Sequence, residues 1–258
     1  MGRKTVLAVL WVAAVTLVAL RVGGGYEERR VETARLAIEV LPAAAGEEVP
    51  KRLQMLIRAD IAGGGDRVRF ELETDGVRKT NPAGPEIELI LDGRDDVYFH
   101  VLEDGPRLPG GASWAHLDAE EAEQVLPGIE GVLTLVEAEN LLTTSRPPDD
   151  LEPVRSETID GVETAVYEHE ATLERMDDVV GMSGETFETM RAALGSEMEV
   201  TIWQDEEGFI RRFAFPVAAS YLAPRLDDGG VVVLQYTIED LGEDVVVELP
   251  DEDDVTTI

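Results

Sequence analysis

Cysteine is absent from all 258 residues of the chain. No disulfide can form, and no thiolate can serve as a nucleophile, a metal ligand or a site of lipid attachment. Histidine is nearly absent: His100, His116 and His169 stand apart, without the HxxxH spacing of a zinc site. We therefore expect no metal site and no cofactor.

Motifs for catalysis are also missing. Ser183 in "GMSGE" lacks the Gly-x-Ser-x-Gly elbow of a serine hydrolase and suits a helix N-cap better. Carboxylate pairs such as Glu168 and Glu170 carry no glycosidase signal in a chain with 54 acidic residues. Since no nucleophile, base and oxyanion donor occur in a recognisable order, we expect that the protein is not an enzyme.

Positive charge is scarce. Arg3, Lys4 and Arg21 are the charged residues up to residue 25, so the rest of the chain has 19 basic and 54 acidic side chains, a net charge of −35. Such a surface repels nucleic acids and anionic lipid surfaces and stays hydrated in salt. Aromatic residues make up 5% and hydrophobic residues 44%, so a core can form but must be mainly aliphatic.

The first 25 residues have the pattern of an export signal. Two basic residues precede an uncharged run over residues 5–20, and Arg21 and small residues follow it. As a helix, this run spans roughly 24 Å, short of the roughly 30 Å hydrocarbon core but able to cross a locally thinned bilayer. Both a cleaved signal peptide and an uncleaved anchor in the cytoplasmic membrane remain open. We expect an exported protein on the outer face of that membrane, in the cell envelope or secreted.

The remainder, residues 26–258, alternates between apolar and polar residues over most of its length. Strands are predicted at 35–40, 53–61, 67–73, 86–91, 96–102, 113–117, 197–204, 209–215, 231–241 and 244–249. "RSETIDGVETAVYEHEATL" (155–173) predicts a hairpin turning at Asp160 and Gly161. Three helices are predicted: one from Asp118 and Glu121, a possible capping box, to Pro127, and two more at 128–142 and 184–194. This order predicts an α+β domain with one strongly curved antiparallel sheet of about eleven strands and short helices over one face.

Four segments in this order resemble a known family. They are "DVYFHV" followed by "SWAHLD", the helix "GIEGVLTLVEAENLL", the hairpin "SETIDGVETAVYEHEATL", and "VTIWQDEEGFIRRFAF" leading to "YTIEDLGEDVVVELPDEDDV". Together they resemble the actinobacterial LppX/LprG-type cell-envelope lipoproteins, whose fold is similar to that of the carrier LolA. The family attaches a lipid to a Cys at the end of the leader, whereas this chain has "RVGGGYEE" there.

The resemblance implies a half β-barrel whose concave face, covered by helices, encloses a cavity for acyl chains. It thus implies an exported monomer that binds lipid or lipid-modified molecules and carries or transfers them. The implied cavity-lining residues are Val68, Phe70, Leu89, Val97, Phe99, Leu133, Val136, Phe187, Met190, Leu194, Met198, Val200 and Phe213.

The alternation also describes an ordinary sheet core. The alternative function is therefore a non-catalytic envelope assembly or signalling-accessory module without a ligand. Two smaller features suit structural roles. "DEDD" (251–254) lacks the ligand spacing of an EF-hand and fits a solvated tail, and Trp114 and Trp203 fit sheet edges better than sugar platforms.

Overall fold

A computed structural model describes residues 31–44, 48–49, 55–63, 66–74, 87–93, 96–100, 108–118, 121–122, 151–172, 197–219 and 230–257. These residues form a twelve-stranded sheet with two short 3₁₀ turns, η3 (Pro109–Gly111) and η4 (Glu252–Asp254). The strands are β1 (Ala34–Pro42), β2 (Met55–Ala62), β3 (Arg67–Thr74), β4 (Ile87–Asp92), β5 (Asp96–His100), β6 (Trp114–Asp118), β7 (Arg155–Ile159), β8 (Val162–Thr172), β9 (Glu197–Asp205), β10 (Ile210–Ala218), β11 (Val231–Glu239) and β12 (Val255–Thr257).

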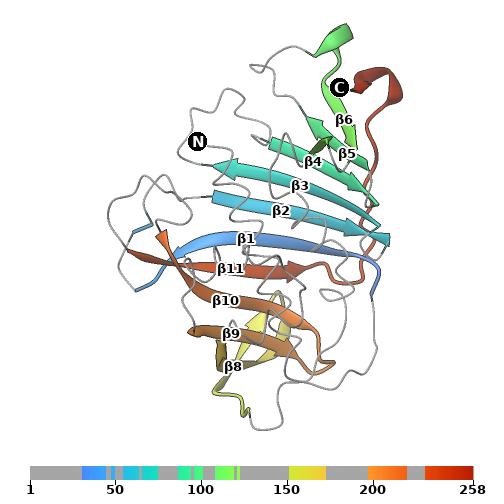
Figure 1. Ribbon diagram of the computed structural model, residues 1–258. Helices are drawn as coiled ribbons and strands as arrows, with labels where there is room; N and C mark the ends of the chain where they lie inside the picture. Colours follow the sequence, from blue (N-terminus) through green and yellow to red (C-terminus); the bar gives the residue numbers. More distant parts are fainter. Residues whose placement is uncertain are drawn as a thin grey trace.

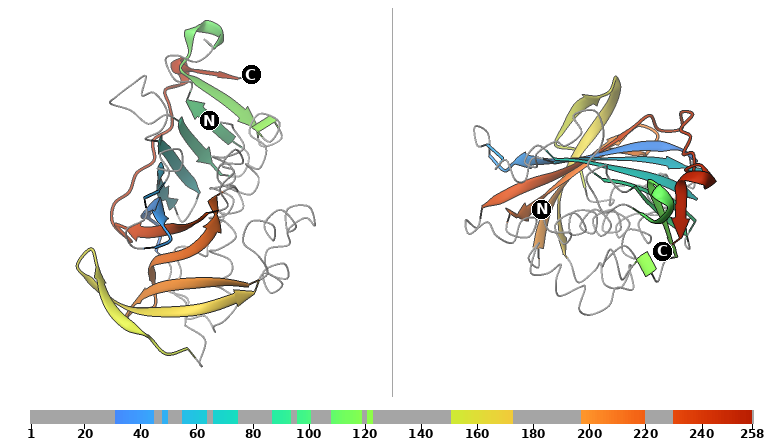
Figure 2. Two further views of the ribbon diagram at one scale, coloured as in Figure 1. Left: turned by 90° about the vertical axis from the view of Figure 1, so that its left-hand side faces the viewer. Right: turned by 90° about the horizontal axis from the view of Figure 1, so that it is seen from above.

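The sheet has the order β12-β6-β5-β4-β3-β2-β1-β11-β10-β9-β8-β7. β1 to β6 therefore form one antiparallel meander and β7 to β11 another, and the two meet where β1 pairs with β11. The strands twist so that the sheet is curved and unclosed, with β7 and β8 at one end and β6 and β12 at the other (Figures 1 and 2). The prediction of a single curved sheet is thus confirmed, while the segments predicted as helices at 128–142 and 184–194 lie outside the described residues.

Two predicted local signals are confirmed. Asp160 and Gly161 link β7 to β8 with φ values of 48° and 84°, the two positive values that a type I′ hairpin turn requires. At the end of β6, the Glu121 N–H donates to the Asp118 carboxylate at 2.8 Å, and the Asp118 N–H donates to the Glu121 carboxylate at 3.2 Å. This reciprocal pair is a capping box.

The Asp205 carboxylate organises the turn between β9 and β10. Its Oδ1 accepts the backbone N–H groups of Glu207 and Phe209 at 3.0 and 2.9 Å. Its Oδ2 lies 2.7 Å from Nε of Arg211, and the carboxylate side chain is only 2% exposed. The charge is thus buried, and it is compensated by one cation and two backbone donors.

The C-terminal segment differs from the prediction in two ways. Residues 244–249 form no strand, although Val245 and Val247 are buried and Val246 is exposed. The segment runs past the ends of the strands toward β6, where β12 pairs with β6 in parallel (Figure 1). "DEDD" is therefore not a free tail: it contains η4, and Asp254 accepts the Ser113 N–H at 2.9 Å.

Among the helices in the described part of the chain, none is long and apolar enough to span a membrane. The predicted leader lies outside the described residues.

Candidate functional site

One face of the sheet is apolar across nine strands, from β6 to β9. The register makes this visible, because residues paired across neighbouring strands point to the same side. One row of paired residues runs Leu36, Ala59, Phe70, Leu89, Phe99 and Ala115, from β1 to β6. At about 4.8 Å per strand, the nine strands extend about 38 Å along the sheet.

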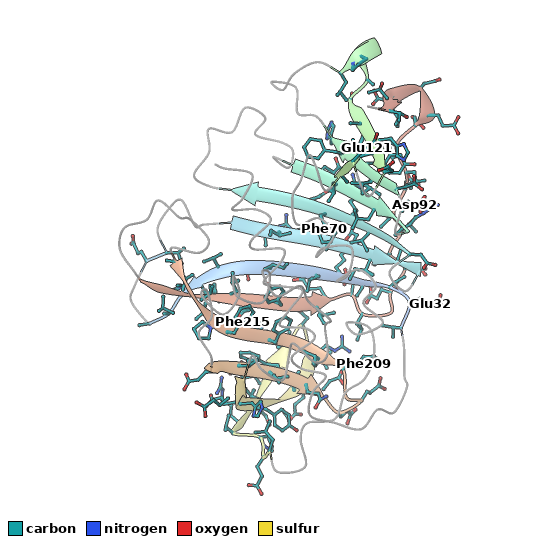
Figure 3. All side chains as sticks on the ribbon, viewed as in Figure 1. Glu32, Phe70, Asp92, Glu121, Phe209 and Phe215 are labelled. Atoms are coloured by element: carbon teal, nitrogen blue, oxygen red, sulfur yellow. The ribbon has the colours of Figure 1, made fainter. Side chains whose placement is uncertain are left out.

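We call this side the apolar face. Its apolar side chains in the described residues are buried, except for Phe99 and Ile202, which are half-buried. They are Ala34, Leu36, Ile38, Val40, Ile57, Ala59, Ile61, Val68, Phe70, Leu89, Leu91, Val97, Phe99, Ala115, Leu117, Val200, Ile202, Phe213, Phe215, Val217, Val232, Leu234, Tyr236 and Ile238. Figure 3 labels Phe70 and Phe215 at two places on the sheet, with β2, β1 and β11 between their strands.

The register assigns eight of the predicted cavity-lining residues to this one face. Val68, Phe70, Leu89, Val97, Phe99, Val200 and Phe213 lie on it, and Met198 occupies a β9 position of the same parity as Val200. The other five, Leu133, Val136, Phe187, Met190 and Leu194, lie outside the described residues. The predicted parity of the strands therefore agrees with the register, while the role of these residues in lining a cavity stays a prediction.

An aromatic cluster lies on the apolar face, and of its three members only Phe213 belongs to the predicted set. The ring of Tyr236 on β11 packs against those of Phe213 and Phe215 on β10, with centroid distances of 4.3 and 5.9 Å. Tyr236 is fully buried and also pairs with Ile38 of β1. The alternation of Val232, Leu234, Tyr236 and Ile238 in "VVVLQYTIEDL" is the signal that could have identified it.

The hydroxyl of Tyr236 is a buried polar group on this face. It finds no hydrogen-bond partner among the residues that the structure describes. Burial raises the pKa of this hydroxyl well above its ordinary value, so the group stays a neutral donor. A buried hydroxyl without a partner costs about 1–3 kcal/mol, which marks this position as unusual.

The opposite face of the sheet is polar and carries ion pairs between neighbouring strands. Arg67 of β3 binds Asp92 of β4 at 2.7 Å, and Arg69 binds Glu88 in the same pair of strands. Farther along, Nε2 of His116 lies 2.6 Å from Asp96. The Arg67–Asp92 pair is partly exposed and adds little to stability, whereas the Glu88 side chain is only 7% exposed. This side of the sheet is therefore mainly polar and charged, although Ile90 is buried on it.

At the β7–β8 hairpin, the buried apolar residues lie on the opposite side of the sheet from the apolar face. Here Ile159, Val166, Trp203 and Ala214 form a small core on the otherwise polar face, with Val233 packed against it. Trp203 also donates from Nε1 to Glu157 at 2.8 Å. On the other side of β8, His169 is exposed. The apolar face therefore ends at β9, and the hairpin packs against the sheet through the small core on the otherwise polar face.

The site offers binding surface rather than reactive groups. Within the described ranges, no three His, Asp or Glu side chains gather as metal ligands. What the apolar face can do chemically is remove hydrocarbon from water, at about 0.8 kcal/mol per methylene.

No family model and no curated relative matches the sequence. Among solved structures, the chain is similar to LppX, a lipoprotein of Mycobacterium tuberculosis, with 12% identity and a TM-score of 0.42 over 84% of this chain and 90% of that one. It is similar to LprF of Mycobacterium bovis, with 12% identity and a TM-score of 0.42 over 92% and 97% of the two chains. An uncharacterised conserved protein of Thermus thermophilus has 10% identity and a TM-score of 0.34 over 88% and 91%.

Proposed function

We propose that this protein is an exported, non-catalytic carrier that binds lipid or lipid-modified molecules against the apolar face of its sheet. The observation that carries the proposal is the continuity of that face over nine strands, in an unclosed sheet whose other side is charged. The helices predicted at 128–142 and 184–194 would cover the face and enclose a cavity. The predicted lining residues on those helices would then form part of the cavity wall.

The energetics suit such a role. A chain of about 16 methylenes gains about 13 kcal/mol on leaving water, at about 0.8 kcal/mol per CH₂. Unassisted diffusion of this lipid across an aqueous layer is therefore negligible, and a carrier must offer a comparable apolar area. Aliphatic and aromatic side chains supply that area without catalytic groups.

The first experiment is native mass spectrometry with lipid extraction on protein purified from its own host. Lipid carried at a defined stoichiometry supports the proposal. Protein that is free of ligand in every preparation supports instead the alternative, a non-catalytic envelope module.

A second experiment tests whether the apolar face borders space for a ligand. Ala59 is 1% exposed and lies in the middle of the face, paired with Leu36 and Phe70. If the space over Ala59 is open, Ala59→Leu fills it, lowers lipid binding and leaves stability nearly unchanged. If the protein's own side chains fill that space, the larger residue overpacks the core and costs about 1–3 kcal/mol.

The matched control is Ala37→Leu. Ala37 lies on β1 on the polar side, paired with Arg58 and Thr237, so its enlargement should change neither lipid binding nor stability appreciably. Destabilisation by Ala59→Leu, in protein that carries no lipid, would reject the carrier.

A further inference from the structure

The buried hydroxyl of Tyr236 needs an explanation that the apolar face alone does not provide. All its neighbours by register are apolar: Phe213 on one side and Ile38 on the other. A phenylalanine would bury the same ring without the cost of an unpaired donor. The Tyr236 side chain is fully buried, and β11 lies in the interior of the sheet. Bulk solvent therefore cannot supply a hydrogen-bond partner to the hydroxyl.

We propose that the Tyr236 hydroxyl is a binding contact for the ligand, donating a hydrogen bond to an acceptor oxygen such as the ester or amide carbonyl of an acylated molecule. This inference rests on the proposed carrier function and narrows its ligand class. The preferred ligand is an acyl ester or amide that places its carbonyl beside Tyr236, with hydrocarbon along the rest of the face.

Two features of the surroundings favour this assignment. The rings of Phe213 and Phe215 pack within 4.3 and 5.9 Å of the Tyr236 ring and hold it in one orientation, so the donor is fixed before the ligand arrives. Burial keeps the hydroxyl protonated by raising its pKa, so it can donate at any physiological pH. A fixed donor among apolar groups distinguishes a carbonyl-bearing chain from plain hydrocarbon, because only the carbonyl satisfies it.

The test compares two probes on the purified full chain: methyl palmitate, and a straight-chain alkane with the same number of heavy atoms. Both are titrated as competitors of a fluorescent acyl probe. In Tyr236→Phe we expect about a five-fold loss of affinity for methyl palmitate, the worth of one hydrogen bond, and no change for the alkane. The control is Tyr98→Phe on the polar face, which should change neither affinity.

The outcomes separate this inference from the proposed function. If wild-type protein binds both probes but Tyr236→Phe weakens both equally or neither, the hydroxyl is no ligand contact and the carrier function stands. If wild-type protein binds neither probe, both proposals fail. The ligand-free variant should unfold at the same urea concentration as the wild type or at a higher one, whereas a clear decrease would mean that the hydroxyl already has a partner within the protein.

Discussion

The ring of Phe213 lies almost parallel to that of Tyr236, with centroids 4.3 Å apart and planes 4° from each other. The register places the two residues opposite each other on β10 and β11, so the contact follows directly from strand pairing. Aromatic pairs contribute about 0.5–1.5 kcal/mol beyond the area that they bury. This pair therefore stabilises the sheet beside its central strands, where the proposed ligand contact also lies.

Removing Phe213 tests how tightly this part of the apolar face is packed. Phe213 is 0% exposed, so Phe213→Ala should lower the free energy of unfolding by about 3–5 kcal/mol, as measured by urea denaturation. Val246 is 72% exposed, and Val246→Ala should stay within about 0.5 kcal/mol of wild type. A loss under about 1 kcal/mol for Phe213→Ala would show that the ring has few packing partners.

Asp205 should be among the most sensitive polar positions. Asp205→Ala leaves Arg211 without its partner at 2.7 Å and frees the N–H groups of Glu207 and Phe209, so we expect a loss of about 3 kcal/mol or more. Asp205→Asn keeps an acceptor but removes the charge, and its loss should be intermediate. Glu206→Ala, at the exposed neighbouring position, is the control. Equal stability of all three variants in urea would contradict this role of the carboxylate.

Glu157 should contribute stability that disappears in acid. Hydrogen bonds from Arg155, and then from Trp203, lower the pKa of Glu157 below its ordinary value of 4.5. Since the folded-state pKa is the lower one, the contribution is complete above 4.5 and is lost as pH falls through the folded value. Glu157→Gln should therefore be less stable than wild type at pH 7, and the difference should vanish in acid. Urea denaturation across this range measures it, and a difference independent of pH would contradict the assignment.

Glu239 should behave with the opposite sign. Partial desolvation of this exposed residue, followed by repulsion from Asp160 and Asp240, raises the pKa of Glu239 above 4.5. Its ionisation therefore costs stability as pH rises through the folded value, and below 4.5 that cost is absent. Glu239→Gln should be more stable than wild type at pH 7 and equal to it in acid. Lower stability of the variant at pH 7 would contradict the assigned cause.

The C-terminal strand should protect one edge of the sheet. Deleting residues 252–258 removes η4 and β12 and leaves β6 as an uncovered edge strand. Uncovered edges pair with other chains, so the truncated protein should self-associate in sedimentation measurements. Asp254→Asn weakens the contact to Ser113 and should have a smaller effect, while Asp253→Asn at an exposed position should have none. A monomeric truncated protein at the same concentration would contradict this role.

The strands of the apolar face could be predicted because apolar residues occur at every second position along them. Val68 and Phe70 on β3, and likewise Leu89 and Leu91 on β4, show this period directly in the sequence, and the register agrees with it. The same signal failed at 244–249. Val245 and Val247 are buried there and Val246 is exposed, yet the segment pairs with no strand. Alternation reports which side chains are covered, not whether the backbone has a hydrogen-bonded neighbour.

Long-range pairing could not be predicted from local patterns. β12 has three residues in an acidic segment, and its place beside β6 depends on where β11 ends. The hairpin of β7 and β8 shows a related limit, because its alternation defines two sets of residues but not which one is covered. The structure buries Val166 and leaves His169 exposed. Tyr236 was missed as a candidate because a single hydroxyl indicates a binding contact only when its neighbours are known to be buried and apolar.

The seam between β1 and β11 has a consequence for the time course of folding. Arg35 and Asp240, which form an ion pair across it, are 205 residues apart in the chain. Pairing of residues so distant in the chain raises the contact order, so this seam should form late and folding should be slow. Until it forms, each half-sheet has an unpaired edge strand beside its apolar face, and the chain in that state would be prone to aggregation.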